Sequence, residues 1–414
     1  MKILFINKYD ISGGAGIAAY RLSKGLEEYF QTENNFLVGI KRSNLTNVYS
    51  TRRPGIENFI ERGTNYLLNK LGLQYKFLPF STGRIIHLTK ELNPDVISLH
   101  NTHGGYFETT LLEELSKTAP IIWTLHDMWA FTANAAHTFG DESWKELKSG
   151  KNEKKHFPQI GFNTGKWLIR QKKEIYRKSD ITITCPSIWL YQLAKQSPLF
   201  HGKNILHIQN GIDISIFKKY NDSDMRSKLN IPKDSKVLAF IAEKGMQSEF
   251  KGGNDLLKIL EGMNERLTEK VHLIIMGLGN FDILNKFSNF IVHKTGYIFS
   301  EELVAKYLSA ADIFIYPTKA DNLPSTLIES LACETPAVTF DIGGCGEIII
   351  DNFNGYLIRP FKIQSFIEKT LFLLFDNNKR QTFGLNGTRY VQDNFSIRTM
   401  TEKYYDLFVG LTKK

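Results

Sequence analysis

Short apolar runs alternate with helix-length amphipathic stretches along the chain, and this alternation constrains the fold more than any other feature. Runs that predict strands lie at 3–6, 36–40, 96–99, 121–125 and 181–184, and then at 237–241, 271–276, 313–316 and 337–340. Strands separated by helices form right-handed βαβ units, which build parallel sheets. The pattern therefore predicts an α/β protein of doubly wound parallel sheets.

The pattern restarts near Lys236, after the polar stretch 221–224 and Pro232. A chain of 414 residues is also too long for one ordinary core. We therefore expect two domains, residues 1–208 and 209–395, with a deep cleft between them. Ligands of such domains bind at the carboxyl ends of the strands. The apolar positions of the tail predict a last amphipathic helix over 396–411.

Composition narrows the class of protein. Hydrophobic residues make up 42% and charged residues 23%, which is typical of globular proteins rather than disordered or fibrous ones. The three cysteines have neither disulfide-framework nor zinc-site spacing, and this favours a reducing compartment. No apolar run approaches the ~18 residues of a spanning helix, and the first residues do not resemble a signal peptide. We expect a cytoplasmic protein.

Positive charge is concentrated in one segment. The net charge is +9, and residues 145–178 contain eleven Lys or Arg against three Glu. Aromatic residues such as Phe162 and Trp167 lie among these charges. Such a segment either binds an anionic membrane surface or forms a solvated loop and helix face, and the sequence leaves both interpretations open. Nucleic-acid binding is not expected, because no nucleic-acid motif accompanies the segment.

A glycine cluster, Gly13-Gly14-Ala15-Gly16, follows the first predicted strand and precedes a helix expected from about Ile17. Glycines let a ligand approach the backbone, and a helix N-terminus presents N–H groups to an anion. The cluster lacks the G-x-G-x-x-G spacing of a nicotinamide site. Both a phosphate loop and a simple turn fit it.

Lysine and glycine meet again in the second half. Lys251-Gly252-Gly253 precedes a helix expected over 254–266, and a lysine placed there can neutralise a diphosphate. A solvated lysine is the alternative. The P-loop pattern is absent, so ATP hydrolysis of that type is disfavoured.

The segment from Asp321 to Glu329 follows the strand at 313–316 and leads into a helix. We expect Asn322 to be the N-cap and Pro324 to lie in the first turn. Backbone N–H groups around residues 323–326 would then bind phosphate or sugar hydroxyls. The acidic residues also fit ordinary helix capping.

Histidines follow two neighbouring strands. His126 and Asp127 come directly after the strand at 121–125, and His100 and His103 follow the strand at 96–99. A histidine at a strand end can donate a hydrogen bond to a substrate hydroxyl or phosphate. A metal site is not expected, because these residues come from separate loops without ligand spacing.

Taken in order, these motifs resemble those of the retaining glycosyltransferases of family 4. The resemblance runs nearly end to end and implies the GT-B fold of two facing Rossmann-like domains. The stretch Leu99–Phe131 looks closest to the colanic-acid and exopolysaccharide branch of the family. The motifs are Gly13–Gly16, His126, Asn210–Asp213, Lys251-Gly252, Gly277–Gly279, Gly296-Tyr297, Asp321 to Glu329 in place of E-x7-E, and Leu331–Val338.

The resemblance implies roles for individual residues. The N-terminal domain, with a crossover helix at 396–414, would bind the acceptor, and the C-terminal domain would bind the nucleotide sugar. His126, Asp127, Lys251 and Asp321 would form the catalytic set. Residues expected to bind the donor are Gly14, Gly16, Lys244, Gly277, Tyr297, Asn322, Leu323, Pro324, Ser325 and Glu329.

Within that set, Glu329 would hold the ribose hydroxyls, Lys251 would neutralise the leaving diphosphate, and His126 would bind the donor sugar. Three departures from the family pattern stand out. Lys244 occupies the region of a usual arginine, Asp321 replaces Glu, and the insert after the H-D-M-W motif is rich in lysine and has no cysteine.

The expected protein is thus a hexosyltransferase-like, retaining, metal-independent enzyme without a cofactor. It would move a sugar from a nucleotide-diphosphate donor to a glycan or lipid-linked acceptor in bacterial surface polysaccharide synthesis, and it would lie at the inner face of the plasma membrane if the acceptor is lipid-linked. Two alternatives remain: a non-catalytic GT-B scaffold or glycan-binding subunit, and a sugar-nucleotide epimerase.

Overall fold

The chain folds into two compact units. The computed structural model describes residues 1–52, 55–241 and 250–413. One unit comprises Met1–Gly211 with Arg398–Lys414, and the other comprises Ile212–Ile397. The predicted domain boundary after residue 208 lies next to the observed division.

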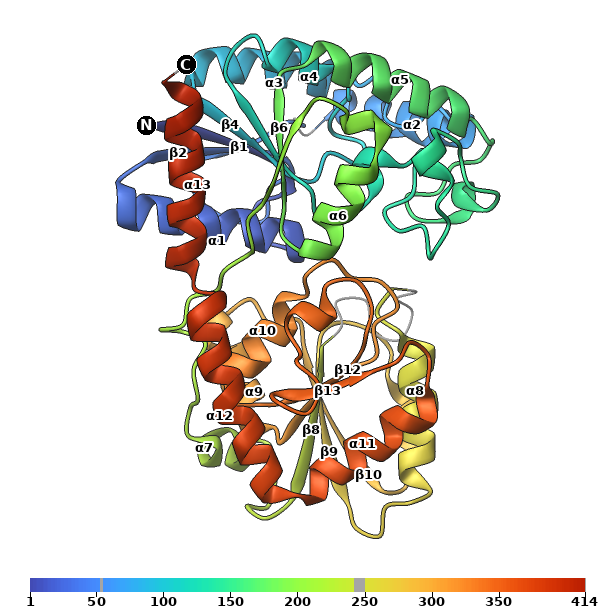
Figure 1. Cartoon of the computed structure of the whole chain (residues 1–414), viewed down its shortest axis with the longest axis vertical. Coiled ribbons are helices and arrows are strands. Elements are labelled where there is room, and N and C mark those ends of the chain that lie inside the picture. The colour runs from blue at the N-terminus through green and yellow to red at the C-terminus, as the bar shows by residue number, and fades with distance from the viewer. Residues whose placement is uncertain (53–54, 242–249, 414) are drawn as a thin grey trace. The chain divides into compact units, whose positions relative to one another are not determined.

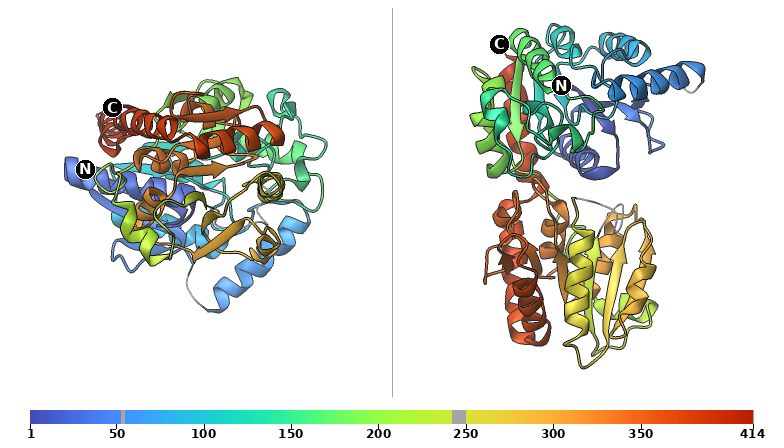
Figure 2. Two further views of the ribbon diagram at one scale, coloured as in Figure 1. Left: turned by 90° about the horizontal axis from the view of Figure 1, so that it is seen from below. Right: turned by 90° about the vertical axis from the view of Figure 1, so that its right-hand side faces the viewer.

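The first unit contains a seven-stranded sheet in the order β3-β2-β1-β4-β5-β6-β7, with every adjacent pair parallel. Helices lie on both faces of this sheet (Figure 1, Figure 2). Its strands are β1 (Lys2–Tyr9), β2 (Glu33–Ile40), β3 (Val48–Ser50), β4 (Val96–Leu99), β5 (Ile121–Thr124), β6 (Ile181–Cys185) and β7 (Asn204–His207). Its helices are α1 (Gly13–Phe30), α2 (Ile56–Lys70), α3 (Pro79–Leu92), α4 (Leu111–Leu115), α5 (Gly165–Lys178), α6 (Ile188–Gln196) and α13 (Ile397–Thr412).

The second unit contains a six-stranded parallel sheet in the order β10-β9-β8-β11-β12-β13. Its strands are β8 (Lys236–Ile241), β9 (Val271–Met276), β10 (Phe290–Gly296), β11 (Ile313–Tyr316), β12 (Ala337–Phe340) and β13 (Gly355–Ile358). Its helices are α7 (Asp222–Lys228), α8 (Gly253–Asn264), α9 (Glu301–Ala310), α10 (Ser325–Ala332), α11 (Ile363–Phe375) and α12 (Asn377–Asn394).

The burial of the central strands explains why their apolar runs could be recognised in the sequence. Every residue of β4, β5, β11 and β12 is buried, as expected for parallel strands covered by helices on both faces. All nine predicted strands are present. The four strands that the pattern missed, β3, β7, β10 and β13, are the outermost strands of the two sheets.

Two predicted helix starts need correction. The helix expected from about Ile17 begins at Gly13, so the glycine cluster forms the first turn of α1 instead of preceding it. The helix expected over 254–266 runs over Gly253–Asn264, with Gly252 as its N-cap in the left-handed conformation. Both helices therefore begin at glycines, which place their first N–H groups directly at the strand ends.

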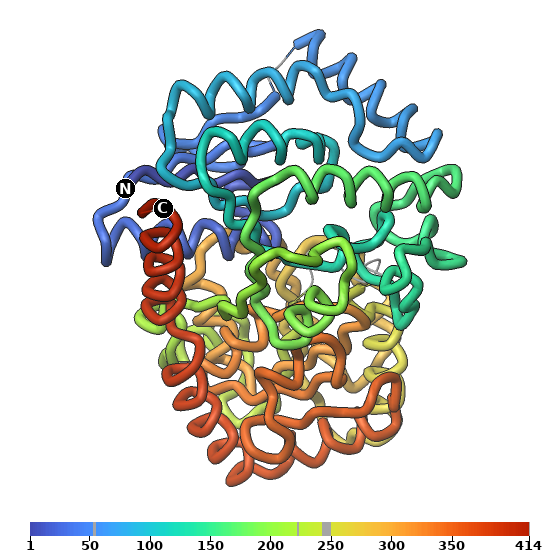
Figure 3. The backbone as a smooth tube through the Cα atoms, turned by 45° about the horizontal axis from the view of Figure 1, so that its top comes forward, coloured from blue at the N-terminus to red at the C-terminus, as the bar shows by residue number. Residues whose placement is uncertain are grey.

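Helix α13 packs on the first unit although it follows the second in sequence. The Tyr404 hydroxyl oxygen lies 2.9 Å from Thr124 Oγ1 and 3.1 Å from Thr184 Oγ1. The rings of Tyr405 and Phe30 stack with centroids 3.9 Å apart, which places α13 beside α1 (Figure 3). None of the described helices is long and apolar enough to cross a membrane.

We expect Tyr404→Phe to lower the free energy of unfolding of the first unit by about 1–2 kcal/mol, because it removes the hydroxyl that bonds two buried threonines. Urea denaturation measures this loss. Tyr405→Phe is the matched control, because the Tyr405 hydroxyl makes no hydrogen bond among the described residues. Equal effects of the two variants would contradict the assigned role of the Tyr404 hydroxyl.

Candidate functional site

Gly14 and Gly16 have different surroundings at the start of α1. A Cβ added to Gly16 would lie 3.2 Å from the carbonyl oxygen of Tyr9, so this glycine allows α1 to pack against the end of β1. Gly14 is exposed, and a Cβ added there would meet no atom within 4 Å. The backbone at Gly14 is thus open to a ligand, while the presence of glycine at 16 is explained by packing.

A chain of hydrogen bonds links Ser98, His100 and His126 at the ends of β4 and β5. Ser98 Oγ lies 3.1 Å from His100 Nε2, and His100 Nδ1 lies 3.0 Å from His126 Nε2. Burial lowers the pKa of His126 to about 4 and that of His100 well below its usual value. Both imidazoles are therefore neutral at pH 7.

This chain determines which nitrogen of His126 carries the proton. The buried Ser98 hydroxyl has no other hydrogen-bond partner among the described residues, so it donates to His100 Nε2. His100 then donates from Nδ1 to His126 Nε2, and the proton of neutral His126 must lie on Nδ1. His126 is only partly buried and can present this N–H to a ligand.

Asp127 is held by a second set of bonds. His103 Nε2 donates to Asp127 Oδ2 at 2.8 Å, and the Trp129 backbone N–H donates to Oδ1 at 2.9 Å. Burial acts to raise the pKa of Asp127, but the interaction with His103 holds it below its usual value. The small cavity beside these residues has a volume of ≈10 Å³, too small for a sugar ring. A ligand can therefore reach them only from the exposed side.

In the second unit, Lys251 and Gly252 lie between β8 and α8. Gly252 has φ +69°, and a Cβ added to it would lie 1.7 Å from the carbonyl oxygen of Pro317. Only glycine fits this close approach to the loop after β11. Gly343 is similarly constrained, since its Cβ would lie 1.7 Å from the carbonyl oxygen of Asp321. The backbone that carries Lys251 and Asp321 is thus tightly packed.

Lys251, Tyr316 and Asp321 contact one another. Lys251 Nζ donates to the Tyr316 hydroxyl at 2.7 Å and forms an ion pair with Asp321, and Tyr316 donates to Asp321 Oδ2 at 2.5 Å. Burial acts to lower the pKa of Lys251, but Asp321 and Tyr316 raise it above its ordinary value. Lys251 is therefore a cation at any physiological pH. Tyr316 was not predicted from the sequence, although it stands at the last position of the buried strand β11.

The prediction that Asn322 caps α10 is wrong. The N-cap is Pro324, and the helix begins at Ser325, so Pro324 also lies outside the first turn. Asn322 is buried, and its backbone N–H donates to Asp321 Oδ1 at 3.0 Å. Leu323 is also buried, and Glu329 lies buried on α10 itself. The segment thus starts its helix later than its composition indicated.

Gly277 and Tyr297 come together at the ends of β9 and β10. The Gly277 N–H donates to the carbonyl oxygen of Gly296 at 2.8 Å, and Gly277 has φ +133°. The Tyr297 ring packs edge-on against Phe299, with centroids 4.6 Å apart. The predicted contact residue Lys244 lies outside the described residues.

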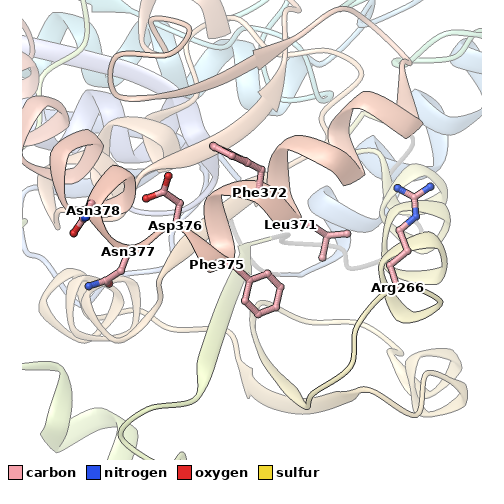
Figure 4. A pocket seen from close by; sticks show the side chains of 7 residues that line it. All are labelled: Arg266, Leu371, Phe372, Phe375, Asp376, Asn377 and Asn378. Atoms are coloured by element: carbon pink, nitrogen blue, oxygen red, sulfur yellow. The ribbon is translucent and has the colours of Figure 1, made fainter.

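The predicted residues of the second unit thus gather around the carboxyl ends of one parallel sheet. A hollow of ≈670 Å³ elsewhere in this unit, near the ends of α8 and α11, contains none of them (Figure 4). It is lined by Arg266, Leu371, Phe372, Phe375, Asp376, Asn377 and Asn378. Within the described part of the chain, no group of three or more His, Cys, Asp or Glu side chains is placed to hold a metal ion.

The fold is similar to that of solved glycosyltransferase structures. Sucrose-phosphate synthase from Thermosynechococcus elongatus is 15% identical with a TM-score of 0.71, over 100% of this chain and 99% of that one. Anabaena HepE in complex with UDP and glucose is 17% identical with a TM-score of 0.68, over 99% of this chain and 100% of HepE. The two Rossmann-like parallel-sheet units therefore form a GT-B fold, as the resemblance implied.

Sequence comparison points to a family within this fold. Residues 221–390, which lie in the second unit, match the model of the Glycosyl transferases group 1 family. An uncharacterized glycosyltransferase of Methanocaldococcus jannaschii is 26% identical over 246 residues, 58% of this chain and 60% of the relative. WcaC of Escherichia coli, named provisionally for colanic acid biosynthesis, is 21% identical over 272 residues, which cover 63% of this chain and 64% of WcaC. Each alignment covers less than two thirds of the relative.

We expect acid to destabilise the first unit through His126. Its pKa is 6.5 in an ordinary setting and about 4 when folded, so between these values the unfolded chain binds a proton that the folded chain does not. The free energy of unfolding should therefore fall by about 1 kcal/mol or more from pH 7 to pH 5. Urea denaturation at both values measures it. His126→Asn should show a smaller decrease, and an identical decrease would contradict this assignment.

Proposed function

We propose that this chain is a retaining, hexosyltransferase-like glycosyltransferase of family 4. It moves a sugar from a nucleotide-diphosphate donor to a glycan or lipid-linked glycan acceptor in bacterial surface polysaccharide synthesis. The observation that carries the proposal is the contact of Lys251 with Tyr316 and Asp321 at the carboxyl ends of β8 and β11. This contact lies within the segment that matches the family model.

The donor binds to the second unit in this proposal. The Lys251 ammonium neutralises the diphosphate, together with the first N–H groups of α10 at Ser325 and Thr326. Glu329 holds the ribose hydroxyls, and the backbone around Gly277 and Tyr297 lies near the base. The structure of HepE with UDP-glucose supports a nucleotide sugar as the ligand class.

Lys251 gains a new partner when the donor binds. Its charge is balanced by Asp321 in the structure, and a diphosphate beside it adds negative charge to the same site. Tyr316, which bonds both side chains, keeps them in place. The excess negative charge that develops on the leaving diphosphate is then stabilised more strongly than the ground state, which lowers the barrier.

In this proposal the first unit supplies a neutral hydrogen-bond donor to the sugar. His126 Nδ1–H donates to a hydroxyl of the donor sugar, and the backbone at Gly14 lies near the diphosphate. Retention through a covalent intermediate needs a carboxylate nucleophile. Asp127 is the carboxylate next to His126, but it already accepts hydrogen bonds from His103 and Trp129. This engagement favours front-face displacement.

In that displacement the bond between the anomeric carbon and the diphosphate oxygen breaks. The bond to the acceptor oxygen forms on the same face of the sugar. The acceptor proton passes to the departing diphosphate oxygen, so the enzyme needs no carboxylate base. Lys251 and the helix N–H groups supply the positive field, and we therefore expect a metal-independent reaction without a cofactor.

A lipid-linked acceptor would be met at the inner face of the plasma membrane. The basic segment 145–178 would then hold the enzyme, otherwise cytoplasmic, at the anionic surface. The colanic-acid and exopolysaccharide branch remains the proposed subgroup, with WcaC as a relative that supports it.

We expect one nucleoside diphosphate among UDP, GDP and ADP, or its sugar conjugate, to raise the melting temperature. A ligand at a hundred times its dissociation constant stabilises by about 2.7 kcal/mol. Glu329→Ala should remove the shift relative to its own unliganded melting temperature, because it removes the ribose contact. Glu265→Ala, an exposed carboxylate after α8, is the control and should keep the shift.

The outcomes separate the alternatives. No shift with any nucleotide would contradict the donor site and favour a non-catalytic scaffold. A shift that persists in Glu329→Ala would contradict only the ribose contact of Glu329 and would leave the rest of the donor site in place. Conversion of a nucleotide sugar to its epimer without an acceptor would favour the epimerase.

We expect Gly14→Ala to weaken donor binding without destabilising the fold. An added methyl group meets no protein atom, and alanine is favoured over glycine in a helix by up to about 1 kcal/mol. If the diphosphate approaches this backbone, the methyl group should raise the dissociation constant of the nucleotide about tenfold or more, which corresponds to a loss of about 1.4 kcal/mol. Calorimetry measures this change. Gly83→Ala in α3, where the added methyl is equally unobstructed, is the control, and equal affinities would contradict the approach.

A further inference from the structure

Helix α2 is oriented with its apolar side outward. Its large apolar side chains are exposed, with Phe59 79% and Ile56 75% accessible. Ile60, Tyr66 and Leu67 are exposed as well, and the spacing of the five residues places them on one side of the helix. Figure 2 (right) shows α2 at the outer edge of the first unit.

The opposite side of α2 is polar and faces the body of the unit. Glu61 is the buried residue of this helix, and it accepts hydrogen bonds from the backbone N–H and the hydroxyl of Ser81. The side-chain oxygens of Asn58, Asn65 and Asn69 are buried without a hydrogen-bond partner among the described residues. Burying such atoms costs free energy. An orientation that buries polar atoms and exposes five apolar side chains needs a compensating apolar contact on the outside.

The C-terminal end of α2 adjoins the basic segment. The Gly161 N–H donates to the carbonyl oxygen of Asn69 at 3.0 Å, and the Thr164 hydroxyl donates to that of Gly72 at 2.5 Å. Phe162 and Trp167, also exposed, follow at this junction. The C-terminal end of α2 and the residues that lead into α5 are therefore neighbours.

The charge on this surface is positive. Lys166, Arg170 and Lys173 are exposed on α5, and they take part in no ion pair within the described part of the chain. On α2, Arg62 and Lys70 are exposed beside the apolar residues, and Lys70 Nζ lies 5.6 Å from the centre of the Tyr66 ring. Long basic side chains around an apolar strip are typical of a surface that lies in the headgroup region of a bilayer.

We propose that the surface formed by the outer side of α2 and residues 161–173 docks on an anionic lipid bilayer, with Phe59 and its apolar neighbours inserted among the acyl chains. The basic residues of α5 contact the lipid phosphates. In this proposal the apolar side chains that enter the bilayer belong to α2, which lies outside the segment 145–178. Docking on the bilayer does not depend on the transferase reaction.

A second copy of the chain is the main competing occupant of α2. An isologous dimer would bring two copies of the same surface together, and with them two sets of unpaired positive charges. Those charges would repel across the interface, whereas the phosphates of an anionic bilayer neutralise them. Charge complementarity therefore favours the bilayer.

Flotation of the full-length protein with vesicles tests the proposal. We expect binding to vesicles of phosphatidylcholine mixed with phosphatidylglycerol and much weaker binding to phosphatidylcholine alone. Phe59→Ser with Leu67→Ser should reduce binding by about tenfold or more, because each buried apolar side chain contributes to insertion. Lys166→Gln, Arg170→Gln and Lys173→Gln together should reduce it on the order of 100-fold in low salt.

Phe372→Ser with Phe375→Ser is the matched control, because these phenylalanines of α11 are exposed to 52% and 50% but lie in the second unit. This variant should bind vesicles as the unaltered chain does. Melting temperatures and nucleotide-induced shifts of all variants should be unchanged, which separates docking from folding and from donor binding.

Three results would overturn the proposal. The first is absence of binding to anionic vesicles, and the second is binding that survives the α2 substitutions. The third is a dimer, seen by light scattering, that Phe59→Ser with Leu67→Ser dissociates while vesicle binding stays unchanged, since α2 would then be an interface between copies.

Discussion

Parallel pairing of every strand in both sheets is the constraint on which the candidate site depends. Parallel strands place all their carboxyl ends along one edge, where the following helices begin. Gly14 on α1, His126 after β5, Lys251 after β8 and Asp321 after β11 are far apart in sequence but share this position in their own sheets. The helix N-termini at the same edges present free backbone N–H groups, which can bind anions. This capacity to bind anions comes from the backbone topology and does not depend on particular side chains.

The side chains at the two sheet edges differ in charge: one edge has a partly buried cation and the other a neutral histidine. In the second unit, Lys251 is kept charged by Asp321 and Tyr316, against the effect of burial. In the first unit, His126 is kept neutral by burial, and its hydrogen bond with His100, which Ser98 orients, leaves its proton on Nδ1. A permanent cation suits a diphosphate, and a neutral N–H donor suits a sugar hydroxyl. The two sheet edges thus differ in charge at neutral pH.

The sequence predicted the buried centre of each sheet well and its edges poorly. Strands β4, β9, β11 and β12 have the bounds that their apolar runs indicated, because strands covered on both faces are largely apolar. The outermost strands β3, β7 and β10 are partly exposed, so their residues are mixed and resemble loops. Strand β13 was missed although it is mostly buried and apolar. Periodicity also pointed to the tail helix at 396–411, which is observed as Ile397–Thr412.

Within the candidate site, the positions of several residues could be predicted from the sequence, but the hydrogen bonds between their side chains could not. The strand-end positions of His126, Lys251 and Asp321 follow from local order along the chain. The role of Tyr316 depends on a hydrogen bond to a residue 65 positions away, which no local pattern encodes. The error at Asn322 is local instead: Asn322 N–H is bound by the side chain of the preceding residue, Asp321, and the helix begins after Pro324.

The placement of α13 has a consequence for the order in which the protein is made. The second unit is continuous in sequence, whereas the core contact of Tyr404 with Thr124 and Thr184 joins segments separated by 280 and 220 positions. During synthesis, the first unit can complete its packing only after residues 398–413 have left the ribosome, which is later than every residue of the second unit. The half of the chain that is translated first is therefore the half whose packing is completed last, and Thr124 and Thr184 are without their Tyr404 partner in the meantime.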